Sequence, residues 1–354
     1  MGLFGPCLLS SDGAPVTRTI AMASKPSGLT VDIDLEARGK RVGHIRLPHS
    51  THESAYGWLA IPVAVIRGGE GPDVLLTAGN HGDEYEGQIA LLKLMRALEP
   101  GALRGRLIIV PQLNLPAAAA GRRTSPLDDG NLNRSFPGDP EGGPTAQIAH
   151  FVDSVLLAMT QVSVDLHSGG SSLVYLPCAF AGVPDGAAAQ ARQRAALEAF
   201  GAPITLMVEK PGSLRTLSAA ARSRGHLHFA TELGGGATTT PQTQTIADQG
   251  LHRLLSHLGV IDEAAVPPAP SRWMRVEGPD HYLYAPVRGL FEPAFSLGDL
   301  VCANDFAGRI HFPEEPERLP RDVYFSGTGL VVCRRVPTLV APGDCLAHLA
   351  SDTD

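Results

Sequence analysis

The sequence predicts an α/β protein, in which helices cover both faces of a sheet. From residue 44 onward, short β-branched runs alternate with segments whose apolar residues recur at helical spacing. Such alternation of strands and helices is typical of α/β sheets that are covered on both sides. The pattern changes at a proline-rich stretch, 263–272, after which short β runs and glycine turns replace the helices. We therefore expect a second, smaller β unit toward the C-terminus.

The expected elements follow from this periodicity and from the turn residues between the periodic segments. We expect strands at 58–66, 74–78, 107–112, 162–167, 204–208 and 228–233. We expect helices at 84–98, 146–159, 187–200, 213–224 and 245–258. The strand at 162–167 is apolar at its start and polar at its end, and open α/β sheets bind their ligands at the carboxyl ends of strands.

The pattern divides the chain into four parts. These are a loose tail at 1–25, the α/β domain at 26–262, a proline-rich linker at 263–272 and a β domain at 273–354. The β domain contains a doubled β-turn-β pattern that resembles the flattened barrel of lipoyl and biotinyl carrier domains. Those domains carry their cofactor on a lysine, whereas the last lysine of this chain is Lys210. We therefore expect a domain without a covalent cofactor that is structural or completes the site.

Composition excludes two classes of partner. The 354 residues include 29 basic and 36 acidic side chains, a net charge of −7 with neutral histidines. The basic residues are scattered singly, whereas nucleic-acid binding needs a concentrated positive field. No apolar run approaches the roughly 18 to 20 residues that a bilayer span needs, which excludes a membrane span. The five cysteines lie far apart without C-x-x-C spacing, so we expect reduced thiols and a cytoplasmic protein.

The first segment with chemical content is 77–87, which follows a predicted strand and opens a predicted helix. His81 and Glu84 are three positions apart, which places an imidazole and a carboxylate on one side of the first turn. Asp83 and Glu86, two and five positions after His81, point elsewhere. Taken alone, the segment favours a simpler interpretation, an acidic first helical turn with His81 as a loop residue.

A second strand end changes that interpretation. The segment 164–170 offers another imidazole, His167, at the carboxyl edge of the sheet. Two histidines and one carboxylate are the three-ligand set of a catalytic zinc with a fourth position open to water. His81, Glu84 and His167 are therefore candidate metal ligands. Asp165 lies on the same strand face as His167 and is a candidate hydrogen-bond acceptor for that imidazole, although a polar residue satisfied elsewhere is the alternative.

Two further segments hold candidate residues. The Pro/Gly-rich loop 122–138 contains three arginines and two asparagines. Arginine in a loop beside a metal suits capture of a carboxylate or stabilisation of an oxyanion, although such a loop is also ordinary surface. Glu232 ends a predicted strand and is followed closely by three glycines, so it is a candidate general base for a water molecule at the metal.

Together these segments resemble the succinylglutamate desuccinylase and aspartoacylase family, which is akin to the zinc carboxypeptidases. The resemblance rests on four motifs in order, G-N-H-G-D-E, N-L-N-R-S-F, D-L-H-S and T-E-L-G, and covers about residues 40 to 350. It implies a zinc-carboxypeptidase-like mixed sheet. It also implies one Zn²⁺ per chain, held by His81, Glu84 and His167.

The resemblance implies the remaining roles as well. Asn133 and Arg134 match the pair that grips the substrate carboxylate, and Glu232 matches the general base. Arg123 matches the arginine on the oxyanion side. Because Arg122 is adjacent, the register leaves both arginines open.

Short stretches at 44–50 and 54–57 resemble the ectoine-catabolic branch, whose members remove the acetyl group from Nα-acetyl-2,4-diaminobutyrate. This implies a small N-acyl amino acid as the substrate. Succinylglutamate desuccinylase or aspartoacylase activity, a carboxypeptidase acting on small peptides, and a non-catalytic zinc-dependent binding protein are the alternatives. None of Tyr282, Tyr284 and Tyr324 aligns with the specificity tyrosine of the aspartoacylases. The sequence allows assembly into a homo-oligomer and does not fix the oligomeric state.

Overall fold

The computed structural model describes residues 28–208, 214–263 and 265–353. The predicted tail at 1–25 lies outside these residues. The strands up to residue 232 are β1 (Thr30–Val31), β2 (Gly39–Pro48), β3 (Trp58–Arg67), β4 (Gly69–Ala78), β5 (Arg104–Val110), β6 (Val162–His167), β7 (Leu173–Tyr175), β8 (Cys178–Gly182), β9 (Ile204–Val208) and β10 (Leu227–Glu232). The later strands are β11 (Arg272–Arg275), β12 (Tyr282–Tyr284), β13 (Gly289–Pro293), β14 (Leu300–Val301), β15 (Phe306–His311), β16 (Arg321–Tyr324), β17 (Gly329–Arg335), β18 (Leu339–Val340) and β19 (Cys345–Asp352).

The helices belong mainly to the first two thirds of the chain. They are α1 (Tyr85–Ala97), α2 (Leu115–Ala120), α3 (Pro144–Phe151), α4 (Ala187–Phe200), α5 (Leu217–Ser223) and α6 (Pro241–His257). Short 3-10 turns lie at Pro100–Ala102, Leu132–Arg134, Leu157–Met159 and Pro279–His281, and a π-helical turn lies at Val152–Leu156.

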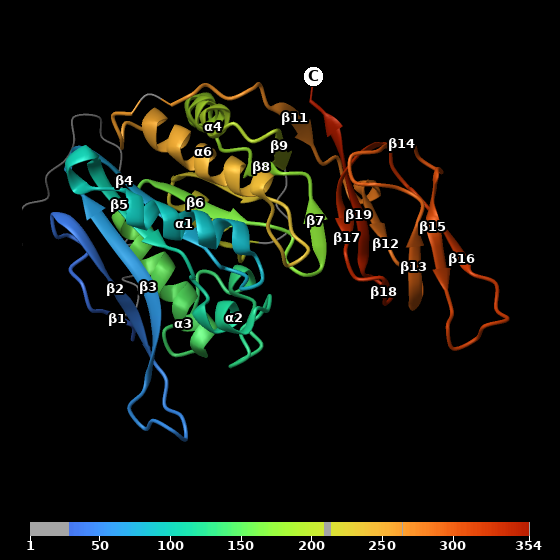
Figure 1. Ribbon diagram of the computed structural model, residues 1–354, viewed down its shortest axis with the longest axis horizontal. Coiled ribbons are helices and arrows are strands. Elements are labelled where there is room, and N and C mark those ends of the chain that lie inside the picture. Colours follow the sequence, from blue (N-terminus) through green and yellow to red (C-terminus); the bar gives the residue numbers. More distant parts are fainter. Residues whose placement is uncertain (1–27, 209–213, 264, 354) are drawn as a thin grey trace, which may run out of the picture.

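A large mixed sheet of 15 strands forms the centre of the molecule (Figure 1). Its hydrogen-bonded order is β1-β2-β3-β5-β4-β6-β10-β8-β9-β11-β19-β17-β14, with β12 paired to β19 and β7 paired to β17. Strands β5, β4, β6 and β10 are parallel neighbours, whereas β3 and β8 flank them in antiparallel orientation. The carboxyl ends of β4, β6 and β10 therefore meet at one edge of the sheet.

Helices cover both faces of this sheet, and each face has its own core. On one face, residues of α1, α4 and α6 pack against buried strand residues such as Leu76, Val164 and Phe229. On the other face, residues of α3 and α5 pack against Leu75 and Ile108. The α/β class and the mixed sheet predicted from the sequence are confirmed.

The predicted helix at 146–159 differs from the structure. The α-helix ends at Phe151 and continues as a π turn at Val152–Leu156 and a 3-10 turn at Leu157–Met159. Within this segment, the hydroxyl of Ser154 donates to the carbonyl oxygen of His150 at 2.7 Å. A side-chain donor that takes a carbonyl four residues back competes with the helical backbone bond, which accounts for the altered winding.

Two other helices begin at positions set by their caps. The helix predicted at 245–258 begins at Pro241, because the Thr240 side chain caps the backbone of Thr243 and Thr243 caps Thr240 in return. The helix predicted at 213–224 is α5, where Thr216 accepts a hydrogen bond from the backbone of Ala219. Its first predicted residue lies outside the described ones.

The C-terminal part of the chain contributes to both sheets. Strands β11, β19, β17, β14 and β12 extend the large sheet, and β16-β15-β13-β18 form a separate sheet of four strands. The pairing of β17 with β7 joins this part to a strand that begins only six residues after His167. The lipoyl-type barrel and the division into domains at 263–272 remain predictions. No helix in the described ranges is long and apolar enough to cross a membrane.

Candidate active site

The loop after β4 carries the first two candidate ligands. Gly79 has a φ of +67°, and a Cβ atom there would lie 3.0 Å from the Cα atom of Gln112. At Gly82 a Cβ atom would lie 2.0 Å from the carbonyl carbon of Ala117 in α2. Glycine is therefore needed at both positions, because the loop turns sharply and lies directly against neighbouring backbone. This tight path places His81 and Glu84 at the carboxyl edge of the sheet.

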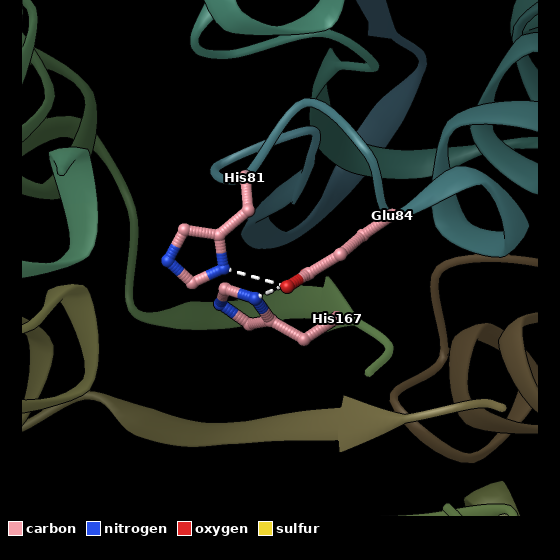
Figure 2. Close-up of side chains that lie close together, drawn as sticks. All are labelled: His81, Glu84 and His167. Atoms are coloured by element: carbon pink, nitrogen blue, oxygen red, sulfur yellow. Dashed lines mark hydrogen bonds and ion pairs between the residues drawn. The ribbon is translucent and has the colours of Figure 1, made fainter. Parts of the chain in front are cut away.

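His81, Glu84 and His167 come together in the structure (Figure 2). The Nδ1 atom of His81 lies 2.7 Å from Oε1 of Glu84, and the Nδ1 atom of His167 lies 2.7 Å from Oε2. All three residues are buried, and one possible ligand atom from each lies within 4.8 Å of the others. In the described part of the chain this is the only group of three His, Cys, Asp or Glu side chains close enough to share an ion.

The second nitrogen of His167 faces a carboxylate. Its Nε2 atom lies 2.8 Å from Oδ2 of Asp165. Asp165 in turn accepts hydrogen bonds from the Thr77 hydroxyl at 2.7 Å and from the Asn80 amide at 2.9 Å. Asp165 therefore fixes the orientation of the His167 imidazole. The Nδ1 atom of His167 is left to face Glu84.

The second nitrogen of His81 has a neutral partner that the sequence reasoning did not assign. The Oδ1 atom of Asn131 lies 3.2 Å from Nε2 of His81. Asn131 lies two residues before Asn133 in the arginine-containing loop. The only sequence signal for Asn131 was its position close to Asn133. Nothing in the sequence of the loop connected Asn131 with His81. The two imidazoles thus differ in the charge of the group behind them.

Electrostatics follow from burial and from these contacts. Burial disfavours a charge on His167, but Asp165 and Glu84 outweigh that effect and raise its pKa well above the usual value. Burial lowers the pKa of His81 despite the neighbouring Glu84. Burial opposes ionisation of Glu84 too, yet the two histidines hold its pKa well below the usual range. Glu84 is therefore an ionised carboxylate between two imidazoles.

The loop after α2 places its side chains at the same site. Arg123 Nη1 lies 3.2 Å from Nδ1 of His81 and 3.6 Å from Oε1 of Glu84, and its side chain is 42% exposed. The amide nitrogen of Asn133 lies 3.4 Å from Nε2 of His167, while its oxygen accepts a hydrogen bond from the backbone of Leu217. The exposed Arg123 thus offers positive charge to a ligand, and Asn133 is held in place from α5.

Arg134 lies next to these groups. Within the described ranges it forms no ion pair with a carboxylate, and its Nη1 atom donates to the backbone oxygen of Asn133 at 2.7 Å. Partial burial and the charge of Arg123 lower the pKa of Arg134, which indicates that the two guanidinium groups are close. Two neighbouring cations of this kind favour an anionic ligand.

Glu232 ends β10 directly beside His167, with which it pairs across the two parallel strands. Its Oε2 atom is buried without a hydrogen-bond partner among the described residues. Burial raises the pKa of Glu232 well above its usual value, and the charge of Glu84 adds to the effect. A carboxylate with a raised pKa next to a metal site can accept a proton from water, which is the property required of a general base.

The donor set fits Zn²⁺. Two imidazole nitrogens and a carboxylate converge from three sides, as in catalytic zinc sites that leave one position open. Asp165 and Asn131 occupy the outer nitrogens of the two imidazoles, so both rings are oriented by partners behind them.

Comparisons with known proteins identify the family of the chain. The model of the succinylglutamate desuccinylase/aspartoacylase catalytic domain matches residues 70–258. The chain belongs to this family. It is also 41% identical over 327 residues to the N-alpha-acetyl-L-2,4-diaminobutyric acid deacetylase of Halomonas elongata, a match that covers 92% of this chain and 96% of the relative.

Solved structures of family members show the same fold over nearly the whole chain. The succinylglutamate desuccinylase/aspartoacylase of Rhodobacter sphaeroides is 38% identical with a TM-score of 0.88. A product-bound structure of the ectoine utilization protein EutE (DoeB) of Ruegeria pomeroyi is 37% identical with a TM-score of 0.89. Each match covers 93% of this chain and 100% of the other. As a member of this family, the chain is a hydrolase of amide bonds.

Proposed function

We propose that this chain is a zinc-dependent deacetylase of Nα-acetyl-2,4-diaminobutyrate. The observation that carries the proposal is the match to a relative of that name along almost the full length of both chains. Arg123 and Asn133 contact the candidate metal ligands, and Glu232 pairs with His167 across β10 and β6, which supports a single reaction centre.

Zinc held by His81, Glu84 and His167 would polarise the amide carbonyl and make a water molecule more acidic. Glu232 would accept the proton of the attacking water and return it to the leaving nitrogen. Arg123 would direct its guanidinium at the negative charge that develops on the carbonyl oxygen. The products would be a free amino acid and acetate.

Asn133 and Arg134 would hold the α-carboxylate of the substrate. Arginine binds a carboxylate through two parallel hydrogen bonds, which fixes direction as well as charge. The charge of Arg123 acts on Arg134, and Arg134 donates to the backbone oxygen of Asn133, which supports a clamp on the same side of the site as the proposed oxyanion arginine. A substrate held in this way is a small N-acyl amino acid with a free carboxylate.

We further propose that the C-terminal β domain, 273–354, narrows the cleft to small substrates and that the protein acts in the cytoplasm. The pairing of β17 with β7 supports the first part, because β7 begins just after the loop that follows His167. Cys178, Cys302, Cys333 and Cys345 are unpaired thiols, which supports the second.

The test is amine release from a panel of substrates by the purified protein. Nα-acetyl-2,4-diaminobutyrate should be cleaved with the highest kcat/KM, ahead of N-acetylaspartate, N-succinylglutamate and small peptides. Preference for N-acetylaspartate or N-succinylglutamate would contradict the substrate and leave the deacylase reaction standing. Cleavage of peptides alone would favour a carboxypeptidase, and zinc binding without turnover would favour a binding protein.

Metal analysis tests the ligands separately. The protein should contain one zinc per chain, and His81→Ala, Glu84→Ala and His167→Ala should each lower that content. His348→Phe is the matched control: His348 is also a buried histidine, but it stacks on Tyr282 and lies outside the metal group. Full zinc in all three ligand variants would remove the proposed site.

A further inference from the structure

Glu86 is a buried carboxylate to which the proposed reaction gives no role. It is the second residue of α1, two positions after Glu84, and only 1% of it is exposed. Neither of its carboxylate oxygens makes a hydrogen bond of normal geometry within the described ranges, although the Ser168 hydroxyl and the backbone nitrogen of Gly235 lie close enough to oppose the rise in its pKa that burial causes. Burying a carboxylate with such weak hydrogen bonding costs stability, so a residue of this kind beside a site is expected to serve a purpose there.

The carboxylate of Glu86 lies directly against the turn that follows Glu232. A Cβ atom on Gly234 would be 2.8 Å from Oε1 of Glu86 and 3.1 Å from Cγ2 of Thr243 in α6. Gly234 also has a φ of +135°, which side chains rarely adopt. The backbone of the turn at Gly234 is therefore packed directly against the Glu86 carboxylate.

This turn connects the loops that carry the base and one candidate metal ligand. The carbonyl oxygen of Gly234 accepts hydrogen bonds from the backbone nitrogens of Gly169 at 3.0 Å and Tyr175 at 2.9 Å. One residue earlier, the backbone nitrogen of Leu233 donates to the carbonyl oxygen of His167 at 3.0 Å. A shift of the turn would thus move Glu232, which immediately precedes Leu233, relative to His167.

The other side of Glu86 is fixed. A Cβ atom on Gly87 would lie 2.4 Å from Cβ of Leu166, so the first turn of α1 is pressed onto β6. The side-chain amide of Gln244 donates to the backbone oxygen of Glu86 at 3.3 Å, which ties α1 to α6. The first turn of α1 is therefore held by β6 and by α6, and the Glu86 carboxylate lies between it and the turn.

We propose that Glu86 is a positioning residue that sets the place of Glu232 beside the metal ligands through the length of its side chain and not through its charge. The proposal rests on the role of Glu232 in the proposed function. It assigns to Glu86 no contact with substrate and no proton transfer.

Two variants separate length from charge. Glu86→Gln keeps the length and removes the charge, whereas Glu86→Asp keeps the charge and shortens the side chain by one methylene. Displacement of a reacting group by about 1 Å can cost about 100-fold in rate, so kcat of Glu86→Asp should fall about 10- to 100-fold. Glu86→Gln should stay near wild type, and both variants should keep their zinc content and KM.

Hydrogen exchange supplies a measurement that does not depend on activity. The backbone amides of Gly169 and Tyr175 donate to Gly234, so their exchange should become faster in Glu86→Asp and remain slow in Glu86→Gln. Met95→Ala is the matched control, since Met95 is buried at the other end of α1. It should lower the thermal stability of the protein without changing kcat or these two amides.

Three results would overturn the proposal. They are a Glu86→Asp variant with wild-type kcat, a Glu86→Gln variant as weak as Glu86→Asp, and unchanged exchange of both amides in Glu86→Asp. The second result would show that the charge acts. If the wild type cleaves no N-acyl amino acid while Glu86→Asp still loosens the two amides, the placement of the turn stands and the proposed reaction fails.

Discussion

Asp165 directs His167: its Oδ2 atom lies 2.8 Å from Nε2 of the imidazole. The tautomer that donates to Asp165 leaves Nδ1 as the free lone pair, and that lone pair faces the candidate metal position. The carboxylate also makes the imidazole a stronger base, and therefore a stronger ligand.

Asp165→Asn tests this relationship, because the substitution keeps the size of the side chain and removes its charge. Loss of an outer partner of this kind typically weakens metal binding about 10- to 100-fold. Competition with a chelator measures the affinity. Asp153→Asn is the control, since Asp153 is a partly buried carboxylate that pairs with Arg224 away from the site. Equal zinc affinity in Asp165→Asn and wild type would contradict the prediction.

Glu232→Gln should bind zinc as wild type does and lose most of its turnover. Glu232 is proposed as the base and not as a ligand, and general bases contribute about 10²- to 10⁴-fold to rates. Zinc content and kcat, measured on the same preparation of Glu232→Gln, test the retained metal and the lost turnover. If kcat stays within a few fold of wild type, another group is the base. Asp83 would then be the next carboxylate to test.

Arg123 and Arg122 should differ sharply although they are neighbours. Arg123 reaches His81 and Glu84, whereas Arg122 contributes its backbone carbonyl oxygen, which accepts a hydrogen bond from the backbone nitrogen of Gly82. Arg123→Ala should lower kcat about 10²- to 10³-fold, the typical effect of removing one oxyanion donor. Arg122→Ala should retain kcat, because its backbone contact is preserved. The opposite order in steady-state kinetics would move the role to Arg122.

Arg134→Lys should raise KM and lower kcat while leaving zinc in place. Lysine keeps the charge but loses the planar pair of donors that matches a carboxylate. Binding energy from the clamp also positions the amide, so both constants should change. Replacing the substrate carboxylate by a carboxamide should have a similar effect on wild-type enzyme. A carboxamide that is cleaved as well as the acid would show that no clamp operates.

The stability of the protein should fall as the pH is lowered from about 6.5 to about 4. Burial lowers the pKa of His228 and of His348 to about 4, from a usual value of 6.5. Between these values the unfolded chain binds more protons than the folded one, so the free energy of unfolding falls by up to roughly 3 kcal/mol per histidine. Denaturant unfolding at several pH values measures the slope.

His348→Phe isolates one of these contributions. The ring of His348 lies 4.4 Å from that of Tyr282 in a stacked arrangement, and phenylalanine preserves this contact. The variant should lose part of the pH dependence between pH 6.5 and pH 4. Substitution of His52, in the exposed loop between β2 and β3, is the control. An unchanged slope in His348→Phe would mean that this imidazole does not titrate as its burial indicates.

The sequence by itself determined the elements with strong periodicity. The strands Val162–His167 and Ile204–Val208 and the helix Ala187–Phe200 have the predicted bounds. The weakly patterned elements were missed: β2 alternates few apolar residues, β8 contains no β-branched residue, and α2 is a short run of alanines. Local periodicity carries information only where enough residues repeat it.

The sequence also supplied the candidate residues of the site, because imidazoles and carboxylates at strand ends can be read directly from the motifs. The tertiary structure decided how they combine. His81 and His167 are 86 positions apart and meet only because β4 and β6 are parallel neighbours in the large sheet. Asn131 behind His81 and Glu86 beneath Gly234 depend in the same way on contacts between distant segments. Strand order and such contacts result from packing between elements, which no local pattern of residues encodes.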